Sequence, residues 1–165
     1  MNGLDILARL TERFGAAVLA SHGEQGDHTA LVERAALPEV LRFCRDDAAL
    51  GFDMLMDLTA VDYLTYPGRE DAPRFEIVYH LYSVPHNHRV RIKAGVEEDD
   101  LVVPTAVPLW PIADWFEREV WDMFGLHFAG HPDLRRLLLY EQFEGHPLRK
   151  DYPVSRRQPL IGPRN

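Results

Sequence analysis

The sequence predicts an α+β fold: a mixed, mostly antiparallel sheet of four to five strands with packed helices, followed by a helix and an extended C-terminal docking segment. Segments of helical and strand periodicity do not alternate regularly, which argues against a doubly wound parallel sheet. The 165 residues suffice for one domain with a substantial core. All three tryptophans fall within residues 110–153, where aromatic, charged and Gly-Pro residues are densest.

Composition excludes several classes of protein. Apolar residues make up 46% and charged residues 27%, both typical of globular proteins. No apolar run approaches the roughly 18 residues that span a bilayer. The N-terminus carries Asp5 where a signal peptide would be basic and then apolar, so we expect a cytosolic chain, or one held at a membrane through partners. Cys44 is the only cysteine, which excludes an iron–sulfur cluster held by this chain alone, since such clusters need about four thiolates.

Charge is distributed unevenly along the chain. Residues 1–133 contain 11 basic and 23 acidic residues, a net charge of −12, whereas residues 134–165 contain 7 and 3, a net charge of +4. The overall charge of −8 argues against general binding of nucleic acid. A basic tail on an acidic body is typical of a docking segment, although a solvated tail is an equal alternative. We therefore expect a compact α/β domain over 1–125 and an extended, basic segment over 126–165 that packs on a partner subunit.

The first half of the chain predicts two helices and a hairpin. Apolar residues recur at helical spacing between residues 4 and 14, with Gly15 ending the helix. Two short apolar runs, 16–20 and 29–33, flank a polar turn and predict a hairpin. Leu37-Pro38 opens a second helix whose apolar stripe runs to Leu50, and Gly51 is its expected stop.

Three strands are expected next. In residues 52–64, alternation places Met54, Met56, Leu58 and Ala60 on one side. Residues 74–84 form the clearest strand, and the turn 85–88 leads to a partner strand around Val90 and Ile92. The two histidines of that turn, at positions 86 and 88, lack a further ligand at metal-binding spacing, so a turn is the preferred interpretation.

Residues 111–124 predict an amphipathic helix. At about 100° per residue, its apolar arc comprises Trp115, Ile112, Met123, Phe116 and Val120, whereas Asp114 and Glu117 fall outside. Two residues break this pattern: Glu119 projects into the apolar arc, and Trp121 onto the polar face. A buried carboxylate needs a partner, and the nearby candidates are Arg118, Arg135, Arg136, Arg149 and Lys150.

These two exceptions support an interface. We expect downstream residues to fold back on the helix and another protein to cover Trp121. The alternative is a helix buried on more sides than the wheel assumes. Glu119 and Asp122 are helical neighbours that could perform acid/base work, but the sequence offers no nucleophile, metal site or cofactor cradle beside them.

A short motif occurs twice after this helix. Phe128-Ala129-Gly130-His131-Pro132 is followed 15 residues later by Phe143-Glu144-Gly145-His146-Pro147. Gly-His-Pro predicts a turn, because proline fixes φ after a permissive glycine. Each histidine lacks a second ligand at useful spacing, so we expect turn-capping or hydrogen-bonding roles for His131 and His146 rather than metal binding.

Several runs carry a family resemblance: EREVWDMFGL (117–126), FAGHPDLRRLL (128–138) and FEGHPLRKDYP (143–153), with LTAVDY (58–63) and RFEIVYHLYS (74–83) upstream. They resemble the C subunit of proton-translocating NADH–quinone oxidoreductase, respiratory complex I, the 30 kDa subunit family. The resemblance covers most of residues 52–153. The first 50 residues match only in outline, and the tail after Pro153 is not diagnostic.

The resemblance implies a non-redox subunit of the peripheral arm, packed mainly on the D subunit near the quinone-reducing end, with the B and I subunits nearby. The complex uses FMN, iron–sulfur clusters, NADH and quinone, whereas this chain is expected to bind no cofactor or metal and to catalyse no step itself. In a bacterium it would lie on the cytoplasmic face of the inner membrane, in contact with the membrane only through the complex.

The helix pattern and the resemblance together imply a set of residues that fold the stretch 110–153 and hold the partner: Trp115, Glu117, Arg118, Glu119, Trp121, Asp122, Gly130, His131, Pro132, Arg135, Arg136, Gly145, His146, Pro147, Arg149, Lys150, Asp151 and Tyr152. Two other functions stay open. The same module could serve a related membrane-bound hydrogenase or a dehydrogenase of another donor. The chain could also be a free-standing acid/base enzyme that uses Glu119 and Asp122.

Overall fold

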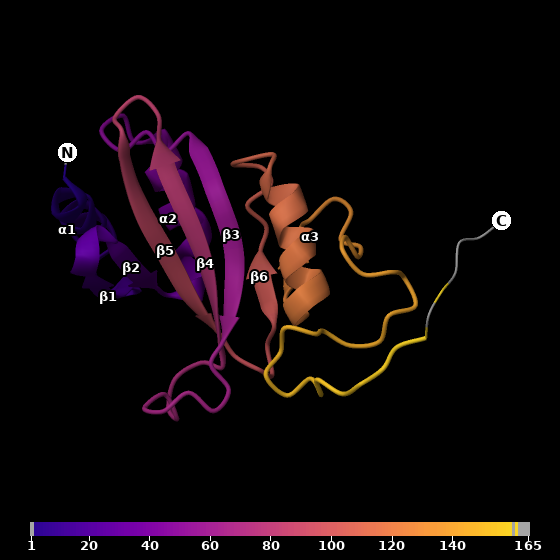
Figure 1. Ribbon diagram of the computed structural model, residues 1–165. Coiled ribbons are helices and arrows are strands. Elements are labelled where there is room, and N and C mark those ends of the chain that lie inside the picture. Colours follow the sequence, from indigo (N-terminus) through magenta and orange to yellow (C-terminus); the bar gives the residue numbers. More distant parts are fainter. Residues whose placement is uncertain (1, 160, 162–165) are drawn as a thin grey trace.

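The computed structural model describes residues 2–159 and 161, and its α+β architecture confirms the predicted fold class (Figure 1). The helices and strands are α1 (Gly3–Phe14), β1 (Val18–His22), β2 (Thr29–Val32), α2 (Leu37–Asp46), β3 (Met54–Asp62), β4 (Phe75–Ser83), β5 (His88–Val96), β6 (Val102–Pro104), α3 (Ala113–Phe124) and β7 (His127–Ala129). Short 3-10 turns lie at Gly15–Ala17, Glu24–Gly26 and Arg34–Ala36.

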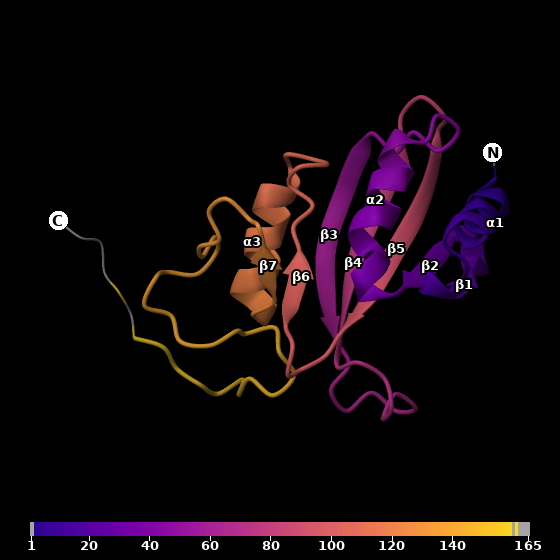
Figure 2. The ribbon, with the colours of Figure 1, turned by 180° about the vertical axis from the view of Figure 1, so that it is seen from behind.

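The main sheet has five strands in the order β1-β2-β5-β4-β3. All neighbours run antiparallel except β2 and β5, which are parallel. Helix α2 lies across one face of the sheet, as the view from behind shows (Figure 2). The core, to which the helices and the sheet both contribute, contains large side chains without solvent exposure, among them Tyr79, Phe52, Phe75, Leu37 and Ile92.

The predicted end of the first helix is confirmed, and that of the second is wrong. Asn2 and Asp5 form a reciprocal capping box at the start of α1, and Gly15 caps its end as expected. Helix α2 ends at Asp46 rather than at Gly51, so that expected stop is wrong. The Asp47 carboxylate accepts hydrogen bonds from the amides of Ala49 and Leu50, and this side-chain contact turns the chain out of the helix.

Strand β3 departs from the predicted alternation. Its register with β4 shifts between Leu55 and Asp57, which marks a bulge. A bulge adds one residue to a strand and thereby inverts the side-chain alternation around it. Leu55 is buried with Leu58, whereas Met56 is 53% exposed, so the expected grouping of Met54 and Met56 with Leu58 and Ala60 is wrong.

Strand β4 lies between β3 and β5, and its alternate residues Phe75, Ile77, Tyr79 and Leu81 are buried. Glu76 on the opposite face is also buried, at 3% exposure. Its carboxylate pairs with Arg69 of the preceding loop at 2.6 Å and with Lys93 of β5 at 3.0 Å. Two cations therefore compensate for the removal of this carboxylate from water.

A second, two-stranded sheet joins the end of the main sheet to the predicted docking segment. Strands β6 and β7 pair in parallel through Val102–Pro104 and His127–Ala129, and α3 connects them. Helix α3 lies beside β3 (Figures 1 and 2). Because β7 lies beyond residue 125, the extended part of the chain begins after Ala129. It then runs along α3 without a further helix or strand among the described residues.

Candidate interaction site on helix α3

Helix α3 is buried on more than one side. Its buried residues are Ala113, Glu117, Arg118, Val120, Asp122, Met123 and Phe124. The predicted apolar arc is therefore only partly right: Val120 and Met123 are buried, but Trp115 and Ile112 are 54% and 47% exposed. The helix packs on the core with one side, while residues 131–149 cover another with polar contacts, which a purely hydrophobic wheel does not anticipate.

The expected burial of Glu119 is wrong, because this residue is exposed. The buried carboxylate is that of Glu117, at 0% exposure. Glu117 Oε2 accepts a hydrogen bond from Thr105 Oγ1 at 2.6 Å, and Oε1 accepts one from the Ala106 amide at 2.6 Å. Burial raises the pKa of Glu117 to about 7; these hydrogen bonds oppose the increase, whereas the nearby Asp114 adds to it.

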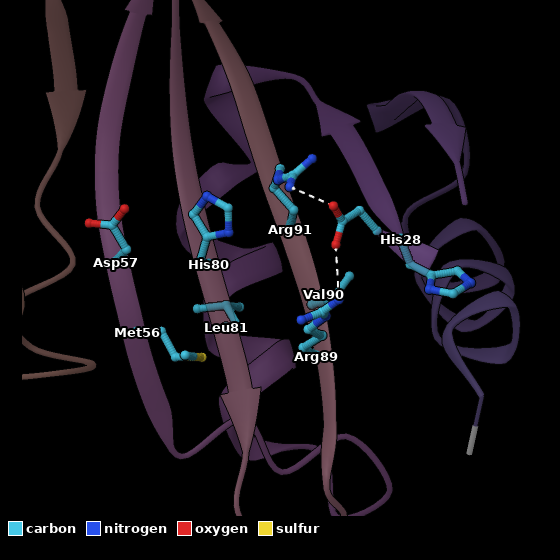
Figure 3. Close-up of a pocket in the computed structure, with 9 residues that line it drawn as sticks. His28, Met56, Asp57, His80, Leu81, Arg89, Val90 and Arg91 are labelled. Atoms are coloured by element: carbon cyan, nitrogen blue, oxygen red, sulfur yellow. Dashed lines mark hydrogen bonds and ion pairs between the residues drawn. The ribbon is translucent and has the colours of Figure 1, made fainter. Parts of the chain in front are cut away.

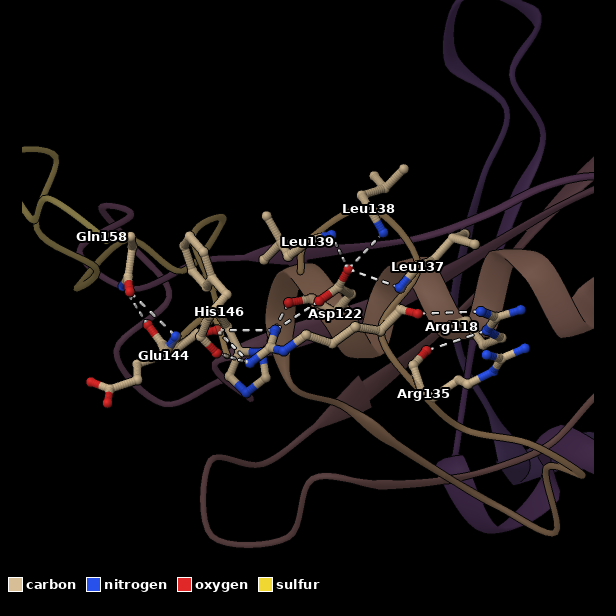
Figure 4. A network of polar contacts seen from close by, with 12 residues as sticks. Arg118, Asp122, Arg135, Leu137, Leu138, Leu139, Glu144, His146 and Gln158 are labelled. Carbon is tan, nitrogen blue, oxygen red and sulfur yellow. Dashed lines mark hydrogen bonds and ion pairs between the residues drawn. The ribbon is translucent and has the colours of Figure 1, made fainter. Parts of the chain in front are cut away.

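The carboxylate of Asp122 binds three consecutive amides of the C-terminal segment. Its Oδ2 accepts hydrogen bonds from the amides of Leu137, Leu138 and Leu139 at 3.1, 2.8 and 2.9 Å (Figure 4). Its Oδ1 accepts one from Arg136 Nη1 at 2.7 Å. Burial opposes the charge on Asp122, but these donors outweigh it and lower the pKa of the carboxyl group.

Two arginines bind main-chain carbonyl groups of the same segment. Arg118 donates from Nε to the carbonyl oxygen of Arg135 and from Nη2 to that of Arg136, both at 3.2 Å. Arg136 donates from Nη2 to the carbonyl oxygen of Phe143 at 2.7 Å. An irregular segment has no helix or ladder to satisfy its backbone, so charged side chains supply the missing partners here.

Trp121 packs against the chain's own C-terminal segment. The Arg136 guanidinium lies 5.6 Å from its ring centroid, and the His146 ring packs edge-on at 6.4 Å. The indole is consequently only partly exposed. The expected cover of Trp121 by another protein is thus supplied at least in part from within the chain, and Arg136 joins this contact to the Asp122 ion pair.

Both Gly-His-Pro motifs form turns whose histidines bond to α3. His131 Nε2 lies 3.1 Å from the carbonyl oxygen of Asp114, and His146 Nδ1 lies 3.0 Å from that of Asp122. Gly130 and Gly145 have φ angles of +85° and +95°, which favour glycine. The predicted hydrogen-bonding role of the two histidines is confirmed.

The end of the segment is attached to the main sheet. The Lys150 amide donates to Asp62 Oδ2 at 2.8 Å, and Arg74 pairs with both Asp62 and Asp151 at 2.9 Å. Arg149 donates from Nε to the carbonyl oxygen of Phe124 at 2.5 Å. These contacts fix the chain at the C-terminal end of α3.

The other residues predicted for this site are more peripheral. Tyr152 stacks on Phe143, with ring centroids 6.1 Å apart. Arg135 is exposed and pairs with Asp133 at 2.8 Å. Pro132 is exposed and Pro147 half-buried, each directly after the histidine of its turn.

Sequence reasoning missed three residues that support the site: Thr105, Asp62 and Arg74. Asp62 ends a strand inside the LTAVDY run and is fully buried, and Arg74 is 7% exposed. A strand that ends in a carboxylate, with an arginine just before the neighbouring strand, is a signal that could have indicated this pair. Thr105 gave no such signal, because its role depends on the packing of α3 against the β6–α3 connection.

A separate hollow of about 260 Å³ lies on the side of the sheet away from α2 (Figure 3). Burial and the neighbouring Arg91 lower the pKa of His80, which stands on the floor of this hollow. Asp27 reaches Arg89 at 3.2 Å and Arg91 at 3.5 Å, and Asp57 faces the hollow from β3. Two arginines and two carboxylates balance one another, so the hollow shows no preference for an anion or a cation.

Grouped metal ligands and long apolar helices are both lacking in the described part of the chain. Within residues 2–159 and 161, no three His, Cys, Asp or Glu side chains are grouped so that they could hold a metal ion. No described helix has both the length and the apolar character to cross a membrane.

Known proteins with similar sequences belong to one family. Residues 30–158 match the family described as the respiratory-chain NADH dehydrogenase 30 kDa subunit. The C subunit of NADH-quinone oxidoreductase from Caulobacter vibrioides is 48% identical over 93% of this chain and 72% of its own length. The same subunit from Burkholderia mallei is 46% identical over 90% of this chain and 75% of its own length.

Solved structures show the same fold. A trypsin-resistant fragment of Nqo5 is 32% identical, with a TM-score of 0.70 over 81% of this chain and all of the fragment. A chain of the membrane-bound sulfane sulfur reductase, an archaeal respiratory membrane complex, is 24% identical, with a TM-score of 0.75 over 93% of this chain and 86% of that one. The family match covers α3, both Gly-His-Pro turns and the Asp62–Arg74 pair, and the chain therefore belongs to the 30 kDa subunit family of the respiratory-chain NADH dehydrogenase.

Proposed function

We propose that this chain is the C subunit of a proton-translocating NADH–quinone oxidoreductase, a non-redox part of the peripheral arm that supports assembly of the quinone-reducing module. Its principal partner is the D subunit, with the B and I subunits as neighbours. Relatives that are 42–48% identical over 88–93% of this chain, and that are named as the C subunit of NADH-quinone oxidoreductase, support the choice of complex. In a bacterium the chain would lie on the cytoplasmic face of the inner membrane.

The observation that carries the docking role is the attachment of the C-terminal segment to α3. Asp122, Arg118 and Arg136 satisfy main-chain groups of residues 135–145, so an irregular segment acquires a fixed shape within one chain. A surface that is ordered before binding loses little conformational entropy on association. Beside it, Trp115 of α3 and Ile112, which immediately precedes the helix, are each about half exposed. Large exposed apolar residues next to an ordered segment are typical of a protein interface.

The geometry gives less support to a free-standing acid/base enzyme. Asp122 is fully buried, and its two oxygens already accept four hydrogen bonds. A general base must be within hydrogen-bonding reach of a substrate proton, and this carboxylate has its acceptor positions occupied. Glu119 is exposed on the same helix and is not a hydrogen-bonding neighbour of Asp122 among the described contacts. Membership of the complex supports the proposal that FMN, iron–sulfur clusters, NADH and quinone belong to other subunits of the complex.

Affinity purification of the tagged chain from native membranes tests this proposal. Co-recovery of flavin and iron–sulfur subunits, with NADH oxidation coupled to quinone reduction, is the expected result. Recovery of the chain with a complex that oxidises another donor would favour the related hydrogenase or dehydrogenase. Recovery of the chain alone would contradict both assignments.

A further inference from the structure

The loop between β3 and β4 has a fixed base. The Tyr63 amide donates to the carbonyl oxygen of Arg74 at 2.8 Å, and Arg74 pairs with Asp62 at 2.9 Å. The Lys150 amide bonds to the same carboxylate, so the C-terminal segment secures this base as well. Beyond the base, residues 64–73 form no helix or strand and extend past the end of the sheet (Figure 1).

Arg69 attaches the tip of this loop to the sheet. It donates from Nη2 to Glu76 Oε1 at 2.6 Å, and its guanidinium lies 3.8 Å from the centroid of the Tyr63 ring. Glu76 is only 3% exposed, so the ion pair is shielded from water. A shielded, charge-assisted hydrogen bond is strong enough to hold an irregular segment in one position.

The attached loop contains a strained residue. Thr65 has a φ of +68° and is the third residue of a turn in which the Tyr66 amide donates to the Tyr63 carbonyl oxygen at 2.8 Å. A positive φ at this position favours glycine or asparagine, and a β-branched residue adopts it only under strain. Gly68 of the same loop also has a positive φ, +79°, but has no side chain to accommodate. Backbone strain of this kind persists only where the surrounding contacts impose it.

The ion pair itself is incomplete on the arginine side and duplicated on the glutamate side. Among the described residues, Arg69 Nε is buried and has no acceptor for its hydrogen. Glu76 Oε2, in contrast, accepts hydrogen bonds from Lys93 Nζ at 3.0 Å and from Tyr63 Oη at 3.2 Å. Lys93 lies on β5 and Tyr63 at the base, so both remain in place when the tip moves. Glu76 therefore keeps partners after Arg69 leaves, which lowers the free-energy cost of releasing the loop.

We propose that residues 64–73 are a flap with a closed and an open state, which turns at Thr65 and is held closed by the Arg69–Glu76 ion pair. Opening relaxes Thr65 and separates the Arg69 guanidinium from the Tyr63 ring, so the open state exposes a cation and an aromatic face that the closed state covers. Tyr63, Tyr66 and Arg69 line a hollow of about 280 Å³, whose shape changes as the flap moves. This device does not depend on the proposed function.

Hydrogen exchange in the full-length chain tests the flap, with the Tyr66 amide as reporter of the tip and the Tyr63 amide as reporter of the base. We expect the Tyr66 amide to exchange at least about tenfold faster than the Tyr63 amide, because the flap opens while the base stays closed. Thr65→Asn should slow exchange at Tyr66 about threefold, since asparagine tolerates a positive φ. Gly68→Ala should accelerate it about threefold, since alanine does not.

Arg69→Met tests the ion pair. Methionine keeps an unbranched stem beside Tyr63 but cannot bind Glu76, so exchange at Tyr66 should rise at least about tenfold while exchange at Tyr63 stays unchanged. Arg89→Met is the matched control, because it removes an arginine that pairs with Asp27 outside the loop. It should leave both rates unchanged. If Arg69→Met unfolds the chain, the opposite effects of Thr65→Asn and Gly68→Ala still decide the matter.

Three results would overturn the flap. Equal exchange rates at Tyr66 and Tyr63 in the unaltered chain would show that the loop opens only together with the sheet. An unchanged or faster rate at Tyr66 in Thr65→Asn would remove the strain from the account. An unchanged rate in a folded Arg69→Met would show that the ion pair does not hold the loop closed.

Trypsin provides a second measurement, because it cleaves after arginine and needs a locally unfolded segment. Cleavage after Arg69 requires the open flap, since the closed state binds this side chain to Glu76. Thr65→Asn should slow that cleavage and Gly68→Ala should accelerate it, by the same factors as hydrogen exchange at Tyr66. Cleavage that does not follow the exchange rates would contradict a single open state.

Discussion

Arg118 and Asp122 lie one turn apart on α3 and bind the same stretch of backbone, Arg118 through its carbonyl oxygens and Asp122 through its amides. Arg118 donates hydrogen bonds to the carbonyl oxygens of residues 135 and 136, and Asp122 accepts hydrogen bonds from the amides of residues 137–139. Residues four apart on a helix are neighbours on its surface, so a single turn supplies both a cation and an anion. The C-terminal segment thus depends on two side chains of α3 for the shape that it presents.

Asp122→Asn should destabilise the isolated chain strongly. The substitution leaves the Arg136 guanidinium, only 14% exposed, without its buried carboxylate, and it removes charge from the acceptor of three amides. Breaking one partner of a buried pair costs about 3–5 kcal/mol. Denaturant unfolding measures the loss. Glu119→Gln on the exposed side of the same helix is the control and should change the free energy of unfolding by less than about 0.5 kcal/mol. Similar losses for the two variants would contradict the role given to Asp122.

Glu119 offers a separate test of the interface. Because its side chain is exposed in the isolated chain, Glu119→Leu should not lower the melting temperature. If Glu119 contacts the partner, the same substitution should reduce assembly of the complex, measured by native gel electrophoresis of membranes. Normal assembly would remove Glu119 from the interface residues, while early melting would show that its role lies within this chain.

Glu117 should make the folded chain sensitive to pH near neutrality. Its pKa of about 7 lies above the 4.5 of an unperturbed glutamate, so the folded state retains a proton that the unfolded state loses. Stability should therefore fall as the pH rises from about 4.5 to about 7, by a total on the order of 3 kcal/mol. The buried Tyr79 of β4 does not titrate in this interval. Burial and the charge of Glu117 both raise the pKa of its hydroxyl well above the ordinary value.

Glu117→Gln should abolish this pH dependence, since glutamine does not titrate. Free energies of unfolding at several pH values between 5 and 8 give the comparison. His80 and His146 have lowered pKa values and are present in both proteins, so their contribution cancels in the difference. Parallel curves for the two proteins would show that Glu117 is ionised in the folded state at these pH values.

The Asp62–Arg74 pair should govern stability in acid. Burial raises the pKa of Asp62, but hydrogen bonds from Arg74 and from the Lys150 and Leu64 amides outweigh this and lower it below the ordinary value of 3.8. Its stabilisation is thus present above pH 3.8 and is lost as the pH falls through the lowered value. Arg74→Met should move the midpoint of acid unfolding to higher pH, as followed by circular dichroism. An unchanged midpoint would contradict the pairing.

Gly125→Ala should loosen the C-terminal segment from α3, because the added methyl group would collide with side chains of that segment as well as strain the backbone at residue 125. Gly125 has a φ of +79°, and an added Cβ would lie 2.6 Å from Arg149 Nη2 and 2.7 Å from the His146 ring. Gly68 has the same φ with no atom within 4 Å, so Gly68→Ala isolates the conformational penalty of about 1 kcal/mol. We expect proteolysis after residue 130 to accelerate in Gly125→Ala only. Equal protease resistance of the two variants would show that the close approach has no structural consequence.

Local signals in the sequence predicted most elements of the fold, since periodicity, caps and turns depend on neighbouring residues. The exceptions arise where a tertiary contact changes the local pattern. The bulge at Leu55–Asp57 inverts the alternation of β3, and the Asp47 carboxylate ends α2 by accepting hydrogen bonds from the amides of Ala49 and Leu50. The three-residue pairing of β6 with β7 is too short to leave a periodic signal.

In the candidate site, too, tertiary contacts override the pattern that the local sequence predicts. The residues of α3 and the Gly-His-Pro turns were identified from the sequence, but the orientation of the helix was not. A hydrophobic wheel assigns one buried side, whereas α3 also buries Arg118 and Asp122 against the backbone of a segment that follows it. Glu117 and Glu119 consequently exchange the environments expected of them. Only the three-dimensional path of residues 131–149 distinguishes the two carboxylates.

The most direct measurement of the central claim is hydrogen exchange at the amides of Leu137, Leu138 and Leu139 in the isolated chain. If Asp122 and Arg118 order the segment before any partner binds, these amides should exchange at least about a hundredfold more slowly than in an unstructured chain. In Asp122→Asn the protection should be lost. Exchange at the unstructured rate in the unaltered chain would contradict the claim that the docking surface is preformed.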